Sequence, residues 1–152
     1  VLRTFAGLAH RIQLVVEDAG VRYYDDSKGT NVGASVAALL GLAEEKAVLI
    51  AGGRDKQGSY APLVAALAKK GRALVVLGEA KDRIREAAEG TLPIAVAGSM
   101  EEAVSLAKGF AKPGDAVLLS PACSSVDMFR VYKHRGDVFA DAARALAKGA
   151  PR

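Results

Sequence analysis

The sequence contains few of the residues that most sharply restrict a protein's class. It has one cysteine, Cys123, and no tryptophan, so an internal disulfide is excluded and a reducing compartment is expected. No apolar run approaches the roughly 20 residues of a membrane-spanning helix. The start, Val1 to Phe5, lacks the layout of a signal peptide and does not begin with Met. We therefore expect a cytoplasmic domain, without a membrane span, cut from a longer chain.

The charge pattern disfavours several classes of binding protein. The net charge is +4, but the sequence contains no long basic run and only 5% aromatic residues, so nucleic acid is not an expected partner. A mild positive excess suits small anions such as phosphates or carboxylates better. There is no cluster of Cys and His residues with the spacing of a zinc site, and we expect no metal ligands in this chain.

Two catalytic motifs are also absent. No serine lies in a G-x-S-x-G elbow, and neither G-x-x-x-x-G-K-[ST] nor G-x-G-x-x-G occurs after an apolar strand. The chain thus lacks an evident phosphate cradle. If it works with a nucleotide, another domain must hold the phosphates.

Short apolar runs alternate with helical patterns along all 152 residues, without repeats or linkers. This alternation predicts a three-layer, Rossmann-like α/β fold: a mostly parallel sheet with helices on both faces, in a single domain over 1–152. An opening hairpin should add an antiparallel edge strand. Strands are expected at 12–16, 21–24, 47–51, 73–77, 94–96 and 116–119, and helices at 32–42, 62–70, 81–89, 100–110 and 138–147.

Three polar loops follow strands of the expected sheet, at residues 25–31, 52–58 and 120–129. Because parallel strands end at the same edge of a sheet, these loops should converge into one cleft. Their hydroxyls, ammonium groups and backbone N–H groups suit a carboxylate or phosphate. A purely structural interpretation stays open, since the same residue types form turns and helix caps.

Within these loops, some residues have a structural alternative. Asp25 and Asp26 are adjacent and should point to opposite faces, so we expect one to bind a ligand and the other to cap or face solvent. The glycines at 52 and 53 allow close approach of backbone to a ligand, and Arg54 and Lys56 could hold an anion. Cys123 is expected to be a packed residue rather than a nucleophile.

Three motifs carry a family resemblance. Asp26-Ser27-Lys28-Gly29-Thr30-Asn31, Gly52-Gly53-x-x-Lys56 and the serine-rich segment from Leu119 to Phe139 resemble the C-terminal domain of the Mur ligases. More narrowly, they resemble the branch of that family that adds D-glutamate. The resemblance spans nearly the whole chain, and the first motif is the most specific, because sister ligases carry other residues there.

The resemblance implies one domain of a three-domain, ATP-dependent enzyme of peptidoglycan synthesis, a cytoplasmic monomer. The absent N-terminal domain would hold the substrate UDP-N-acetylmuramoyl-L-alanine, and the absent central domain would carry the P-loop and Mg²⁺. The domain present here would bring D-glutamate and close over ATP. In the family, an acyl phosphate forms on the substrate's carboxylate, and the amine of D-glutamate attacks it.

The resemblance also implies roles for individual residues. Arg11 and Asp26 would contact the adenosine end of ATP, and Lys28 would face its phosphates. The carboxylates of D-glutamate would be held by Thr30, Lys56, Ser125 and the backbone near Tyr132. No residue of this domain alone is expected to be catalytic, so the fragment should be inactive by itself. Gly29 stands where the family often has alanine, which reads as a mild change.

Three alternatives remain open from sequence. The chain could be a stand-alone module that binds a small anion, part of a sister Mur ligase with another amino-acid substrate, or a structural domain whose loops are only turns. Substrate choice and binding by the isolated chain separate them.

Overall fold

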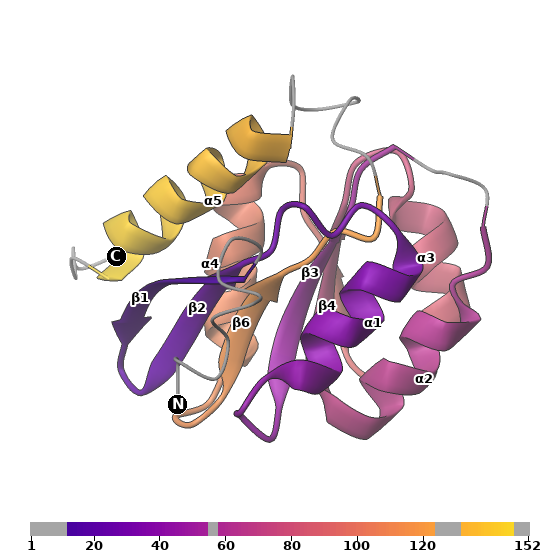
Figure 1. Cartoon of the computed structure of the whole chain (residues 1–152), viewed down its shortest axis with the longest axis horizontal. Coiled ribbons are helices and arrows are strands. Elements are labelled where there is room, and N and C mark those ends of the chain that lie inside the picture. The colour runs from indigo at the N-terminus through magenta and orange to yellow at the C-terminus, as the bar shows by residue number, and fades with distance from the viewer. Residues whose placement is uncertain (1–11, 55–57, 124–131, 148–152) are drawn as a thin grey trace.

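The computed structural model describes residues 12–54, 58–123 and 132–147, with only the backbone described at 132 and 133. The chain forms an α/β fold whose elements follow one another as the sequence predicts (Figure 1). The elements in chain order are β1 (Gln13–Asp18), β2 (Val21–Asp25), α1 (Val32–Gly41), β3 (Ala47–Gly52), α2 (Ala61–Lys70), β4 (Gly71–Leu77), α3 (Lys81–Ala88), β5 (Ile94–Val96), α4 (Met100–Phe110), β6 (Ala116–Leu119) and α5 (Tyr132–Ala147).

The six described strands form one sheet in the order β1-β2-β6-β3-β4-β5. Every neighbouring pair is parallel except β1 and β2, which form an antiparallel hairpin at one edge. The predicted parallel sheet with an antiparallel edge strand is therefore confirmed. The register pairs Gln13 with Asp25, so β1 begins at the edge of the sheet where the parallel strands end.

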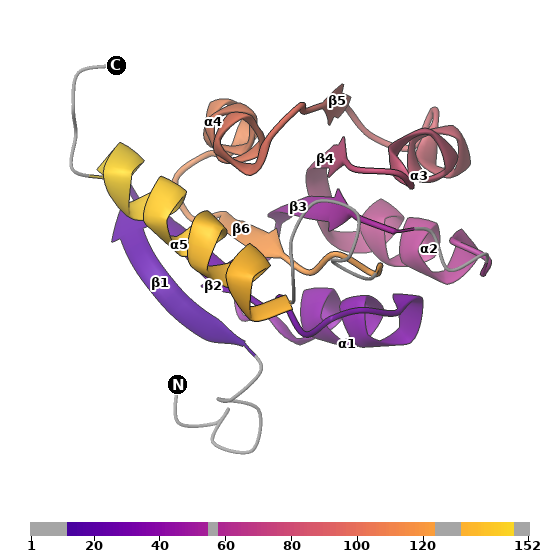
Figure 2. The same cartoon turned by 90° about the horizontal axis from the view of Figure 1, so that it is seen from above.

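Helices cover both faces of the sheet, as Figure 2 shows from above: α1, α2 and α3 lie on one side and α4 and α5 on the other. The central strands β3 and β6 are buried along their whole length, which explains their unbroken apolar sequence. One apolar cluster joins the sheet to α1–α3 and includes Leu39, Leu63 and Leu67. The second joins it to α4 and α5 and includes Met100 and Phe139.

Side-chain caps set the starts of two helices. Asn31 Oδ1 accepts from the N–H of Ala34 at the start of α1, and Ser99 Oγ accepts from Glu102 at the start of α4. These bonds satisfy backbone donors that a helix N-terminus leaves without an internal partner. No helix in the described ranges is long and apolar enough to span a membrane.

The start of the last helix differs from the prediction. The sequence places it at Val138, but α5 begins six residues earlier, at Tyr132. A glycine inside a helix costs about 1 kcal/mol. Gly136 and the charged residues beside it therefore predict a loop. In the structure Arg135 and Gly136 are buried, so tertiary packing outweighs local propensity here.

Candidate functional site

Backbone hydrogen bonds join the three loops that were predicted to converge. The N–H of Asp26, after β2, donates to Leu119 O at 2.8 Å, and the N–H of Ala122, after β6, donates to Gly29 O at 2.7 Å. The N–H of Gly52, at the end of β3, donates to Pro121 O at 2.9 Å. The described parts of the three loops therefore meet at one edge of the sheet, as predicted.

Asp25 and Asp26 point to opposite sides of the sheet, as expected for adjacent residues. Asp25 Oδ1 accepts from the N–H of Ser27, two residues along the chain, at 2.9 Å. Burial raises the pKa of Asp25 above its ordinary value, and the hydrogen bonds from Ser27 oppose this only in part. Asp26 instead faces α1, where it is only 1% exposed.

Two buried hydroxyls form a chain that reaches one oxygen of the Asp26 carboxylate. Ser120 Oγ lies 2.8 Å from Asp26 Oδ2 and 2.9 Å from Ser35 Oγ. Ser35 Oγ also donates to the carbonyl oxygen of Ser120 at 3.0 Å. Ser35 lies in the first turn of α1 and was not singled out in the sequence, because a serine near a helix start reads as an ordinary surface residue.

Backbone conformation at the edge is tight. Ala122 has φ of 64°, in the left-handed region that costs a non-glycine residue about 1 kcal/mol. Gly52 has φ of 133°, and a Cβ built on it would lie 1.9 Å from Leu77 O. At Gly52 the close approach is thus to the backbone of β4, which gives this glycine a packing role independent of any ligand.

The first turn of α5 packs directly on the loop after β2. The Arg135 side chain, 1% exposed, donates from Nη2 to Ser27 O at 3.0 Å. A Cβ on Gly136 would lie 2.6 Å from both Asp25 Oδ2 and Ser27 Oγ. Both residues belong to the motif that carries the resemblance, but no pattern in the sequence indicates that they anchor this helix to the Asp26 loop.

The structure describes only some of the residues with a predicted role. Asp26 is buried, Lys28 is exposed and Thr30 is partly exposed in the loop after β2. Tyr132 is described by its backbone alone, as the first residue of α5. The remaining predicted residues lie outside the described ranges: Arg11, Lys56 and Ser125.

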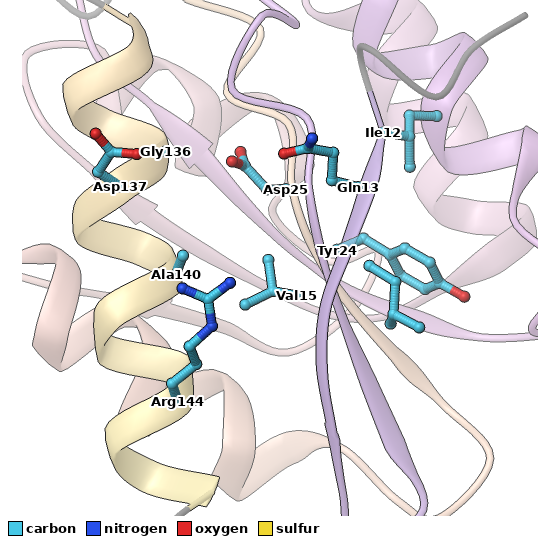
Figure 3. Close-up of a pocket in the computed structure, with 10 residues that line it drawn as sticks. Ile12, Gln13, Val15, Tyr24, Asp25, Gly136, Asp137, Ala140 and Arg144 are labelled. Atoms are coloured by element: carbon cyan, nitrogen blue, oxygen red, sulfur yellow. The ribbon is translucent and has the colours of Figure 1, made fainter. Parts of the chain in front are cut away.

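A cavity of about 470 Å³ lies beside this edge, between β1 and α5 (Figure 3). Asp137 and Arg144 of α5 form one wall, and Gln13, Val15 and Asp25 lie on the opposite wall. None of the residues assigned to D-glutamate or ATP lines it among those described. The cavity lies on the α5 side of the sheet, whereas Asp26 faces α1 on the other side.

Two side chains of the loop after β2 have the chemistry to contact an anionic group. Within 12–54, 58–123 and 132–147, no three His, Cys, Asp or Glu side chains gather closely enough to hold a metal ion. Lys28 and Thr30 supply an ammonium and a hydroxyl on the exposed side of the loop. This donor set fits phosphate and carboxylate groups.

Comparison with known sequences identifies close relatives. The chain is 52% identical over 151 residues to UDP-N-acetylmuramoylalanine--D-glutamate ligase of Burkholderia mallei (strain SAVP1), covering 97% of this chain and 30% of the relative. It is 48% identical over 149 residues to the ligase of the same name from Legionella pneumophila (strain Lens), covering 96% of this chain and 33% of the relative. The chain thus spans about a third of the length of these curated relatives.

Comparison with solved structures identifies the fold. The murein peptide ligase of Psychrobacter arcticus superposes with a TM-score of 0.65 at 14% identity, over 93% of this chain and 30% of that one. The MurF ligase of Thermotoga maritima, solved in complex with ADP, gives a TM-score of 0.52 at 18% identity, over 87% and 31%. At these identities the likeness establishes the fold alone.

The family comparison is specific. The family described as Mur ligase, glutamate ligase domain, matches residues 10–123. That match contains all six described strands of the sheet, since every strand from β1 to β6 lies between residues 13 and 119. Together with the two ligases that align along nearly all of its length, this match shows that the chain belongs to the glutamate ligase domain family of the Mur ligases.

Proposed function

We propose that this chain is the amino-acid-binding and ATP-closing domain of a ligase that joins D-glutamate to UDP-N-acetylmuramoyl-L-alanine. The observation that carries the proposal is the 52% identity, along 97% of the chain, to a ligase whose name states that substrate pair. The convergence of three polar loops at one edge of the sheet supports it, because such edges are the usual ligand sites of open α/β sheets.

The proposed chemistry assigns this domain the tasks of binding and orientation. D-Glutamate carries two carboxylates, and its amine must face an activated acyl group. Thr30, Lys56 and Ser125, with the backbone near Tyr132, would hold the carboxylates through hydrogen bonds and one ammonium group. Holding a nucleophile in the correct orientation lowers the barrier by several kcal/mol, so these residues would act without exchanging a proton.

ATP would be shared with the rest of the enzyme. In this proposal Arg11 and Asp26 contact the adenosine end and Lys28 faces the phosphates, while Mg²⁺ and the P-loop belong to a central domain outside this chain. Bound ATP would supply the phosphoryl group that activates the substrate's carboxylate. Because Asp26 is buried in this structure, its contact with a ribose hydroxyl requires a local rearrangement of the surrounding chain.

The domain boundaries, compartment and assembly follow from the same proposal. Residues 1–152 would form one domain of a cytoplasmic monomer, with the UDP-sugar domain and the central domain preceding it. Alone, the chain would lack the phosphate and metal sites and be inactive. The buried thiol of Cys123 is compatible with such a reducing compartment.

The test uses the full-length ligase that contains this chain. Phosphate release is measured with ATP, UDP-N-acetylmuramoyl-L-alanine and D-glutamate, and then with L-alanine in place of D-glutamate. We expect turnover with D-glutamate and a rise of about 10-fold or more in its KM for Thr30→Ala and Lys56→Ala, since each removes a hydrogen bond to a charged group. Lys69→Ala, an exposed lysine of α2, is the matched control and should leave KM unchanged.

Three results would count against the proposal. Equal use of L-alanine and D-glutamate would favour a sister ligase. Unchanged kinetics in both the Thr30 and Lys56 variants would favour a structural domain. Binding of D-glutamate to the isolated chain with the same affinity as to the whole enzyme would favour a stand-alone binding module.

A further inference from the structure

Ser120, which follows β6, lies at the edge of the sheet where the loops after β2, β3 and β6 meet. It is not among the residues assigned to D-glutamate or ATP. Its N–H donates to Ile50 O at 3.2 Å, and its carbonyl oxygen accepts from Ser35 Oγ at 3.0 Å. Its hydroxyl contacts both Ser35 Oγ and Asp26 Oδ2. Ser120 therefore connects the ends of β3, β6 and β2 with the first turn of α1.

The protons of the two hydroxyls can be assigned from these contacts. Ser120 Oγ donates to Asp26 Oδ2 at 2.8 Å. Ser35 Oγ donates to Ser120 O at 3.0 Å and lies 2.9 Å from Ser120 Oγ. Ser35 thus fixes Ser120, and Ser120 fixes one oxygen of Asp26.

The hydrogen bond between Ser120 and Asp26 is tightly enclosed. Ser35 and Ser120 are fully buried, and a Cβ on Gly29 would lie 2.4 Å from Ser120 Oγ and 2.8 Å from Asp26 Oδ2. The missing side chain at position 29 thus makes space for the hydrogen bond between Ser120 and Asp26. A hydrogen bond to a charged group in such a buried setting is stronger than one between neutral groups.

We propose that Ser120 is a positioning residue for the nucleotide: its hydroxyl fixes Oδ2 of Asp26 and thereby orients the other carboxylate oxygen, which is buried in this structure, for a ribose hydroxyl of ATP once the surrounding chain has rearranged. This inference rests on the proposed function, since it presumes that the ligase binds ATP through Asp26. Ser120 itself does not touch ATP. Its effect should consequently appear in ATP binding and depend on Asp26.

The experiment compares full-length enzymes by steady-state kinetics, with ATP and D-glutamate varied separately. Ser120→Ala should raise the KM for ATP about 10-fold, the usual size for a lost hydrogen bond to a charged group, and leave the KM for D-glutamate within about 2-fold. In an Asp26→Asn background, Ser120→Ala should add less than about 2-fold, because the two residues act through one contact. Ser99→Ala, which removes the cap of α4, controls for a general loss of stability and should change neither KM.

The outcomes separate this inference from the proposed function. A wild-type enzyme that does not turn over D-glutamate overturns the proposed function and the inference with it. An active wild type whose KM for ATP is unchanged by Ser120→Ala overturns the inference alone, as does an equal rise in both KM values or a full effect in the Asp26→Asn background. If Ser120→Ala does not fold, Ser35→Ala replaces it. Ser35→Ala should raise the KM for ATP about 3-fold, and an unchanged KM for ATP would overturn the inference.

Discussion

The hydroxyl of Tyr60 lies 3.4 Å from the sulfur of Cys123, and both side chains are buried. Tyr60 precedes α2, at the end of the connection that leaves β3, whereas Cys123 belongs to the loop after β6. The Arg83 guanidinium lies 5.1 Å from the centre of the Tyr60 ring and donates to Gly58 O at 2.8 Å. This pair therefore links two of the three segments that meet at the candidate site.

Removal of the Tyr60 hydroxyl should weaken this link without disturbing the ring. For Tyr60→Phe we expect a loss of about 0.5–1.5 kcal/mol in the free energy of unfolding, measured by urea titration. Tyr60→Ala, which also removes the ring, should lose about 3–5 kcal/mol. In a double-mutant cycle of Tyr60→Phe and Cys123→Ala, losses of unfolding free energy that add fully would show that the hydroxyl and the sulfur do not interact.

A side chain at position 29 should be costly in this protein. Gly29→Ala places a methyl group against Ser120 Oγ and Asp26 Oδ2, and we expect a loss of about 1–3 kcal/mol in the free energy of unfolding. The loss should shrink in a Ser120→Ala background, where the obstructing oxygen is absent. Gly109→Ala is the matched control: nothing lies within 4 Å of the new methyl group in α4, and a gain of about 0.5–1 kcal/mol is expected.

If Gly29→Ala were neutral and Gly109→Ala stabilising, the loop would have to move freely enough to keep the Asp26 hydrogen bond beside an alanine. The expectation from sequence that glycine here is a mild change would then hold. The structure argues otherwise, because the nearest atom belongs to a hydroxyl that is already committed to a buried carboxylate.

The charge of Asp25 should oppose folding at neutral pH. Burial raises the folded-state pKa of Asp25 above its unfolded value, so its contribution to stability is full at low pH and is lost as the pH rises through the folded pKa. Asp25→Asn, which can still accept from Ser27, should therefore stabilise the chain at pH 7 and have little effect at pH 3. Urea titrations at the two pH values test this, and an equal offset at both would contradict it.

Asp115 should show the opposite dependence. Burial alone would raise its pKa, but the hydrogen bonds from Arg72, at 2.9 and 3.1 Å, and from the N–H of Lys112 outweigh burial and hold the pKa below its ordinary value. Its stabilisation is thus present above the unfolded pKa, near 4, and is lost as the pH falls through the folded pKa. Asp115→Asn should cost about 2 kcal/mol at pH 7 and progressively less below pH 4.

The cause can be separated with Arg72→Gln. If the ion pair depresses the pKa of Asp115, Asp115→Asn should cost less at pH 7 in the Arg72→Gln background than in the wild type. A pH profile of the free energy of unfolding that is the same for wild type and Asp115→Asn would contradict the assignment.

The fold was predictable because its strongest signals are local. The unbroken apolar runs at β3 and β6 indicate strands buried on both faces, and Asn31 and Ser99 occupy cap positions that the helical pattern marks. The start of α5 was not predictable, since Arg135 and Gly136 look like loop residues until Ser27 and Asp25 are placed against them.

The candidate site was predictable to the level of loops but not of contacts. The order of strands and helices is enough to bring the ends of β2, β3 and β6 to one edge of a parallel sheet. The hydrogen bond between Ser120 and Asp26 joins residues 94 positions apart, and only the register of β2 against β6 makes it possible. Ser35, 85 positions from Ser120, gave no separate signal in the sequence.

The antiparallel edge strand has a geometric consequence for any motion of the domain as a rigid body. Because Gln13 pairs with Asp25, β1 enters the sheet beside the loop after β2, so in a rotation about this entry point that loop would lie nearest to the axis. In the strand order β1-β2-β6-β3, the loops after β6 and β3 lie progressively farther from that axis. A rotation about the entry point would therefore carry those two loops through longer arcs than the loop that holds Asp26.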